Sequence, residues 1–191
     1  MISLKNLAAS VLIPAMFSIA TLNTIVQAGF VYVDTDARGA NDGSSWTDAY
    51  RSLQDALQSS TQDDEIRVAQ GVYRPDQFTA RGRGGPVVSE SGDRSATFLL
   101  ENGVTVEGGY AGFGEPDPDA RDVYLYKTIL SGDLNGDDAP EFLNRTDNSI
   151  RVVTCTSTNL SCLLDGVTIT GGGATRTEGP CPMLGAVFIM L

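Results

Sequence analysis

The feature that most constrains this chain is an eight-residue segment that occurs twice. The segment NGVTVEGG at 102–109 is followed by a similar segment, DGVTITGG, at 165–172. The Asn-Gly or Asp-Gly pair favours a tight turn with a positive φ at glycine, and the Gly-Gly pair permits a second bend. Between the bends, alternate Val and Ile side chains would share one face of a strand. Each copy therefore predicts a turn, a short strand and another turn.

The spacing of the copies predicts a repetitive fold. They begin at positions 102 and 165, which corresponds to about three coils of roughly 20 residues, within the range of solenoids. A coil buries its apolar face only when neighbouring coils stack on it. The 21 glycines of the 191-residue chain fit many short elements. Further short strands are predicted at 30–33, 66–69, 97–100, 128–130, 150–154 and 162–164, with long polar loops at 79–94 and 112–122.

One amphipathic helix is predicted near the N-terminal end of the folded part. Trp46, Tyr50, Leu53 and Leu57 follow spacings of four, three and four, which place them on one helix face. Ser52, three residues before Asp55, fits an N-terminal cap, so the regular helix could start as late as Ser52.

Residues 1–28 have the composition of a secretory signal peptide. Lys5 precedes an apolar run over 7–25, and Val26-Gln27-Ala28 ends it with small residues at the positions that a signal peptidase requires. The alternative is an N-terminal membrane anchor, against which Pro14 and the cleavage-like ending argue. We expect a secreted or cell-surface (outer-membrane) protein that begins at Gly29 and has no stable membrane span.

Charge and composition narrow the classes of function. The formal net charge is −11 and histidine is absent. A negative field repels nucleic acid and anionic membranes, which leaves cations, neutral glycans and proteins as partners. The lack of histidine excludes Ser-His-Asp and Cys-His catalysis.

The three cysteines have two interpretations in an oxidising compartment. Cys155 and Cys162 flank a polar, turn-like stretch, so a disulfide between them is feasible. Two small buried side chains in neighbouring strands are an equally good interpretation. Cys181 has no obvious partner in the sequence.

Several segments together resemble a known family. They are VYVD at 31–34, NDGSSW at 41–46, LQDAL at 53–57, DEIRVAQGVY at 64–73, SGDLNGDD at 131–138 and DGVTITGG at 165–172. As a set they resemble the N-terminal part of secreted bacterial right-handed parallel β-helix proteins, including those grouped with polymorphic outer membrane proteins. The resemblance covers approximately 30–173. It implies an all-β, right-handed parallel β-helix (solenoid) over 29–178, whose open N-terminal end is covered by a strand and the amphipathic helix.

The end of the chain departs from that family. Residues 179–191 (GPCPMLGAVFIML) are apolar and lose the glycine-rich pattern, as in a truncated or frameshifted product. We treat them as an atypical apolar tail. An uncapped C-terminal end exposes strand edges, which predicts self-association through that end.

One acidic turn is a candidate metal site. Asp133, Asn135 and Asp137 place oxygen atoms at alternate positions, as calcium loops do, and Asp138 could complete a weak calcium site. The sixth position is Asp138 instead of glycine and the twelfth is Asn144 instead of glutamate, which excludes an EF-hand. The alternative is a solvated acidic turn without a metal.

These observations favour an exported, non-catalytic protein of the cell-surface or adhesion type. Its loops would contact extracellular glycans or proteins, and no catalytic residue or bound organic cofactor is predicted. The alternative is a fragment of an extracellular polysaccharide lyase or hydrolase. Pectin-cleaving β-helix hydrolases carry a histidine motif that this chain lacks, and no lyase motif surrounds its arginines.

Overall fold

A computed structural model describes residues 29–82, 85–155 and 162–173. The predicted signal peptide and the apolar tail lie outside these residues. The elements, in chain order, are β1 (Phe30–Val33), α1 (Leu53–Ser59), β2 (Glu65–Ala69), β3 (Gly71–Tyr73), β4 (Gln77–Gly82), β5 (Gly85–Glu90), β6 (Phe98–Leu100), β7 (Thr105–Tyr110), β8 (Thr128–Ser131), the 3-10 helix η1 (Pro140–Phe142), β9 (Val153–Cys155), β10 (Leu163–Asp165) and β11 (Val167–Thr170).

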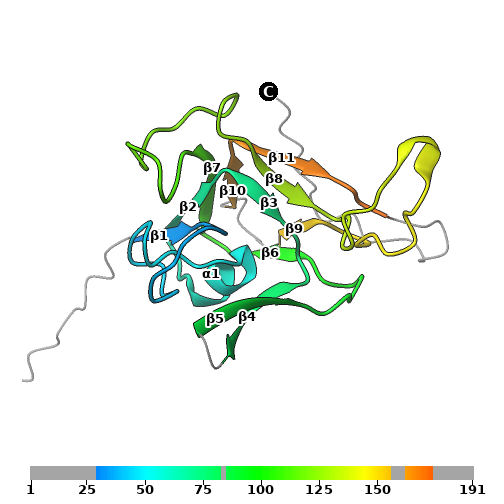
Figure 1. The fold of residues 1–191 in the computed structure, drawn as a ribbon, viewed down its shortest axis with the longest axis horizontal. Helices are drawn as coiled ribbons and strands as arrows, with labels where there is room; N and C mark the ends of the chain where they lie inside the picture. Colours follow the sequence, from blue (N-terminus) through cyan, green and yellow to red (C-terminus); the bar gives the residue numbers. More distant parts are fainter. Residues whose placement is uncertain (1–28, 83–84, 156–161, 174–191) are drawn as a thin grey trace, which may run out of the picture.

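The described strands form four small sheets (Figure 1). A parallel four-stranded sheet has the order β1-β2-β7-β10, and a parallel three-stranded sheet has the order β11-β8-β3. Strands β6 and β9 form a parallel pair, whereas β4 and β5 form an antiparallel hairpin. Helix α1 contacts β1, β2, β4 and β6, and it lies between the parallel strands and the hairpin (Figure 1).

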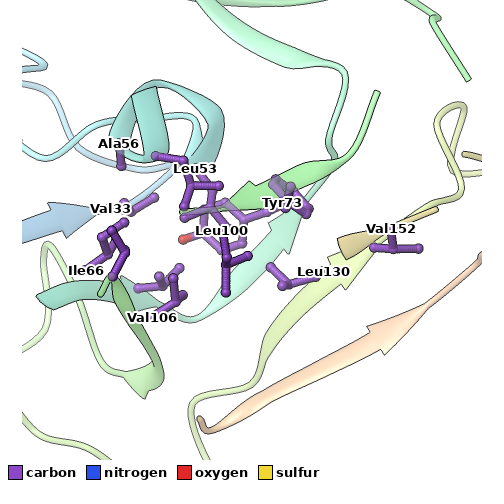
Figure 2. Close-up of a cluster of buried hydrophobic side chains, with 13 residues drawn as sticks. Val33, Leu53, Ala56, Ile66, Tyr73, Leu100, Val106, Leu130 and Val152 are labelled. Atoms are coloured by element: carbon purple, nitrogen blue, oxygen red, sulfur yellow. The ribbon is translucent and has the colours of Figure 1, made fainter. Parts of the chain in front are cut away.

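The main core gathers three side chains from α1 and one or two from each of β1, β2, β3, β6, β7 and β8 (Figure 2). Its fully or almost fully buried members include Val33, Leu53, Ile66, Val106 and Leu130. They come from β1, α1, β2, β7 and β8, so side chains distant in sequence exclude water together. Burial of this apolar area is the main force that holds the short strands in register.

The predicted fold class is wrong. In place of an all-β parallel β-helix, the described residues form several small sheets of mixed direction together with a helix, a small α/β-like arrangement without a solenoid. The segment 79–94, predicted as a polar loop, contains most of the antiparallel hairpin β4–β5. Antiparallel pairing of that kind cannot be part of a coil of parallel strands.

The two copies of the octapeptide occupy different positions in the fold. Gly103 and Gly166 both have positive φ values, 84° and 66°, so the predicted turns are confirmed. The first strand, β7, lies inside the four-stranded sheet with Val106 fully buried. The second, β11, lies at the edge of the three-stranded sheet, where Ile169 is 37% exposed. The copies share local turn geometry, but their strands β7 and β11 belong to different sheets. Asp165, the first residue of the second copy, lies at the end of β10 and pairs with Glu107 of the first copy.

The amphipathic helix exists but is shorter than its apolar spacing predicts. It begins after Ser52, whose hydroxyl accepts a hydrogen bond from the backbone N–H of Gln54. Trp46 lies before the helix, and its indole packs against Tyr32 and Tyr110. Tyr50 forms an isolated parallel bridge to Val33. The two aromatic residues therefore bury apolar surface without being helical.

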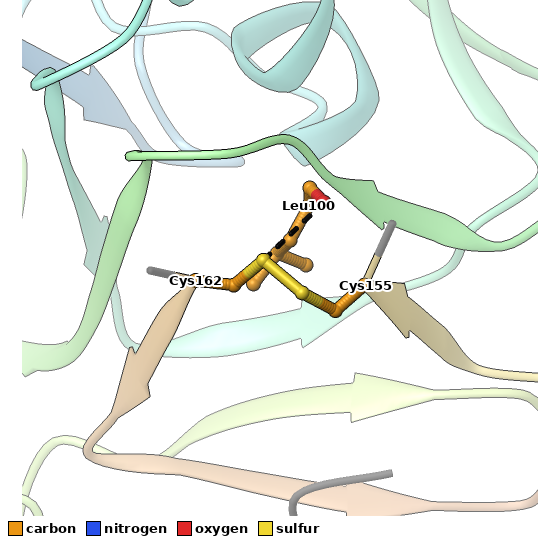
Figure 3. Close-up of a disulfide and its surroundings, with 3 residues drawn as sticks. All are labelled: Leu100, Cys155 and Cys162. Atoms are coloured by element: carbon orange, nitrogen blue, oxygen red, sulfur yellow. Dashed lines mark hydrogen bonds between the residues drawn. A yellow bond between two sulfur atoms is a disulfide. The ribbon is translucent and has the colours of Figure 1, made fainter. Parts of the chain in front are cut away.

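A disulfide joins Cys155, at the end of β9, to Cys162, just before β10 (Figure 3). The two Cα atoms are 6.6 Å apart. The sulfur of Cys162 lies 3.6 Å from the carbonyl oxygen of Leu100 in β6. Of the two interpretations that the sequence allowed, the structure contains the disulfide, and this disulfide links two sheets.

Across the residues that the structure describes, no helix combines the length and the apolar composition that a bilayer crossing requires.

Candidate functional site

The acidic turn predicted as a calcium site is the first part of the loop between β8 and β9, residues 132–152. Asp133 organises this turn. Its Oδ1 accepts hydrogen bonds from the backbone N–H groups of Gly136 and Asp137, at 2.7 and 3.1 Å, and its Oδ2 accepts one from Asp138 at 3.0 Å. A carboxylate that accepts N–H groups two to five residues onward is a common way to close a tight turn.

The structure brings together two of the predicted ligands, Asp133 and Asp137, and adds Asp147. Oxygen atoms of Asp133, Asp137 and Asp147 lie within 4.8 Å of one another. Asn135 is exposed, and its backbone N–H donates to Asp147 Oδ2 at 3.0 Å. Asp138 instead accepts from the Asn148 amide at 3.0 Å and lies 3.7 Å from Arg145.

Asp147 is the member of the cluster that the sequence did not reveal. It lies 14 positions after Asp133, too far for a linear calcium-loop pattern to include it. The loop returns to its own start, as the bond between Asn135 and Asp147 shows. Nothing in the spacing of the acids indicates this return.

The carboxylates of this cluster lie close enough together to repel one another. Loss of solvation, followed by repulsion from Asp147, Asp133 and Asp138, raises the pKa of Asp137 above its usual value. A cation would relieve this repulsion, and carboxylate oxygens are the ligands that calcium prefers. Because both oxygens of Asp133 already accept backbone hydrogen bonds, Asp137 and Asp147 are the better-placed ligands. Calcium binding here stays a prediction.

A second cluster of charges lies on one face of the four-stranded sheet. The strand register places Tyr32, Arg67, Glu107 and Asp165 in one row across β1, β2, β7 and β10. Arg121, from the loop after β7, donates to Asp165 at 2.5 Å and to the backbone oxygen of Gly108 at 2.9 Å.

The charged groups of this row form hydrogen bonds and ring contacts with other groups of the same chain. Arg67 donates to Glu65 at 2.7 Å, and its guanidinium lies 3.7 Å from the centre of the Phe30 ring. The Tyr110 hydroxyl donates to Glu107 at 2.9 Å. Burial, followed by this hydrogen bond, raises the pKa of Tyr110 to about 12. The cluster therefore joins strands and a loop, and each of these groups already has a partner.

The loop between β7 and β8, residues 111–127, presents apolar side chains to solvent. Val123, Tyr124 and Leu125 are 39%, 80% and 66% exposed. Asp122 fixes their backbone, because its Oδ1 accepts hydrogen bonds from the N–H groups of Tyr124 and Leu125 at 2.9 and 3.1 Å. The neighbouring Arg121 anchors the base of the turn.

A similar pair occurs in the loop between β8 and β9. Phe142 and Leu143 are 80% and 59% exposed. Glu141, Phe142 and Asn144 all have a φ of 62°, a left-handed conformation that is uncommon for residues other than glycine. The aromatic residues Tyr73 and Tyr110, in contrast, are buried at 1% and 5% exposure, so they pack inside the fold.

Comparison with known proteins provides no relative: no family model, no curated protein and no solved structure matches the chain. The resemblance to secreted β-helix proteins is therefore untested by comparison.

Proposed function

We propose that the chain is an exported, non-catalytic cell-surface or adhesion-type protein whose loops bind extracellular proteins or glycans. The observation that carries the proposal is the exposure of Tyr124 and Leu125 at 80% and 66% on a turn held by Asp122. With Val123 they form a run of three consecutive exposed apolar residues, and such a run on a soluble protein is typical of a binding surface. Tyrosine is also among the residues that most often dominate the binding energy of interfaces.

Two further observations support export and a binding role. The disulfide between Cys155 and Cys162 favours an oxidising compartment, because cytosolic thiols are kept reduced. The predicted signal peptide favours the same destination. The net charge of −11 disfavours nucleic acid as the partner.

The enzymatic alternative would require a free arginine or a free pair of carboxylates near a cleft. Arg67, Arg121 and Arg145 each lie within 4 Å of a carboxylate oxygen, at 2.7, 2.5 and 3.7 Å. Such pairing keeps a guanidinium protonated, which disfavours its use as a base. This pairing disfavours these three arginines as catalytic bases, and we propose the binding function.

The proposal is tested by binding of the purified full chain to a panel of immobilised extracellular-matrix proteins and neutral glycans. The double variant Tyr124→Ala/Leu125→Ala should weaken binding by at least about tenfold, since two exposed anchors are removed. Val87→Ala, which truncates a 54% exposed side chain on the hairpin, is the matched control and should bind normally. Binding to nothing on the panel, or equal binding by the double variant, would contradict the proposal.

A further inference from the structure

The described core is covered differently at its two ends. At one end, helix α1 contacts the edge strands β1 and β6 and packs its buried apolar side chains against the core. Strands β10 and β9 are the opposite edges of the same two sheets, and β11 is an edge of the third parallel sheet. The disulfide between Cys155 and Cys162 joins β9 to β10, and Gly166 alone separates β10 from β11. The three edge strands therefore lie together at the other end.

The side chains that these edge strands direct toward the core are only partly covered. The strand register pairs Ile169 with Leu130 and Leu164 with Val106, and paired residues of a sheet point to the same face. Leu130 and Val106 are fully buried, whereas Ile169 is 37% exposed and Leu164 is partly buried. Val153 in β9 is likewise partly buried, although its partner in β6 is fully buried. Apolar surface continuous with the core is therefore accessible at this end.

This end also carries little charge. Asp165 is the only charged residue in β9, β10 and β11, and it forms an ion pair with Arg121 at 2.5 Å. The chain as a whole has a net charge of −11, so repulsion opposes the approach of two copies over most of the surface. At an apolar end whose one charge is paired, local repulsion is small and burial of apolar area favours contact.

We propose that two copies of the chain associate end to end through β9, β10 and β11. A two-fold axis brings identical surfaces together, so that Ile169 and Leu164 of both copies become buried in one contact. Such a contact uses the same end of each copy, and α1 covers the other end. The association therefore closes at two copies instead of growing into a fibre. This inference does not depend on the loop to which the proposed function assigns binding.

The test is sedimentation equilibrium of the purified full chain over a wide range of protein concentrations. The data should fit an equilibrium between monomer and dimer without larger species. Ile169→Glu should raise the dissociation constant of the dimer by about tenfold or more, because a charge would enter the apolar contact. Since Ile169 is exposed in the single copy, this variant should keep the fold.

Val72→Glu is the matched control. Val72 is 44% exposed on β3, the opposite edge strand of the sheet that contains β11. This variant adds the same charge to the chain and should dimerise as the parent does. Amide hydrogen exchange provides a second readout, because the amides of β10 and β11 should exchange more slowly at high protein concentration while those of β3 stay unchanged.

Two further variants distinguish other contacts. Tyr124→Ala/Leu125→Ala should dimerise normally even where it loses the partner of its loop, which separates this inference from the proposed function. Phe188→Ser/Ile189→Ser, in the apolar tail, should also dimerise as the parent does.

Four results would overturn the proposal. They are a parent that is monomeric at every concentration, assemblies larger than two copies, equal effects of Ile169→Glu and Val72→Glu, and a change of the dimer in either double variant. The last result would assign the association, or the cover of this end, to the loop or to the tail.

Discussion

At the scale of single residues, Asp34 connects two distant parts of the chain. It is 3% exposed at the end of β1. Its Oδ1 accepts from the Asp36 N–H at 2.8 Å, and its Oδ2 accepts from the Phe113 N–H at 2.6 Å. Gly112, with a φ of 86°, permits this approach, because a Cβ there would collide with Asp34 Oδ2. The loop that presents Tyr124 therefore depends on Asp34 at its first turn.

Asp34 should give the stability a recognisable pH dependence. Burial raises its pKa above the usual 3.8, against the hydrogen bonds from Phe113 and Asp36 that lower it. The Asp34 carboxyl group therefore binds a proton more tightly in the folded protein than in the unfolded chain. Protonation of Asp34 contributes its full stabilisation of the fold below the pKa of the unfolded chain, and this contribution is lost as the pH rises through the pKa of the folded protein. In urea titrations, the unfolding free energy of the parent minus that of Asp34→Asn should fall as the pH rises above 3.8, the usual pKa of the group. A difference that stays constant or rises would show that Asp34 is not perturbed in this direction.

Substitutions of Asp133 and Asp137 should distinguish the structural role of the acidic turn from calcium binding. Asp133→Ala should lower the unfolding free energy by about 1–3 kcal/mol without calcium, because three N–H groups lose their acceptor. Asp137→Asn should leave that value nearly unchanged but abolish a saturable rise of the melting temperature with calcium.

The control for this calcium effect is Asp117→Asn, which changes an exposed acid outside the cluster. It should keep the calcium response. If the parent shows no rise, or Asp137→Asn keeps it, the acids form a solvated turn.

At the scale of elements, the sequence predicted local geometry better than it predicted partners. The cap at Ser52, the strand at 30–33 and the left-handed turns at Gly103 and Gly166 follow from interactions within a few residues, and all are present. Pairing partners depend on contacts between distant segments. The hairpin at 77–90 was therefore missed, and the two octapeptides were placed wrongly in one solenoid.

The same limit applies to the candidate site. Asp133 and Asp137 could be grouped because they are neighbours in sequence, whereas Asp147 joins them only through the path of the loop. Asp138 could not be excluded beforehand, because its bond to Asn148 depends on that path as well.

The disulfide should stabilise the elements around it measurably. It joins two cysteines that are seven positions apart in the sequence. By limiting the conformations of the unfolded chain, a disulfide across so short a loop raises the free energy of unfolding by about 2–3 kcal/mol. The double variant Cys155→Ser/Cys162→Ser should lose about this much in urea unfolding, and a reducing agent should have little further effect on it. If the parent in the same reducing agent keeps its full stability, the link contributes nothing.

At the scale of the whole molecule, the two ends of the parallel sheets differ. Strand β1 is an edge of the four-stranded sheet, but Tyr50 bridges to it and α1 contacts it. Strands β9, β10 and β11 are edges whose outer sides have no paired strand among the described residues. Leu163 and Ile169, on two of these strands, are 46% and 37% exposed.

The exposed apolar side chains on these edge strands predict self-association, since the edge of a sheet is a template for pairing with another chain. Sedimentation velocity should show an average mass that rises with concentration. Leu163→Lys/Ile169→Lys should reduce the association, because charged edge residues oppose it. A parent chain that remains a monomer over the whole concentration range would contradict the prediction.

The claim on which the account depends is that the chain works outside the cytoplasm. The most direct test is the intact mass of the protein recovered from each fraction of cells that express the full sequence, before and after alkylation. We predict a non-cytoplasmic species that begins at Gly29 and in which Cys155 and Cys162 react only after reduction. An unprocessed chain in the cytoplasm with both of these thiols free would contradict the account.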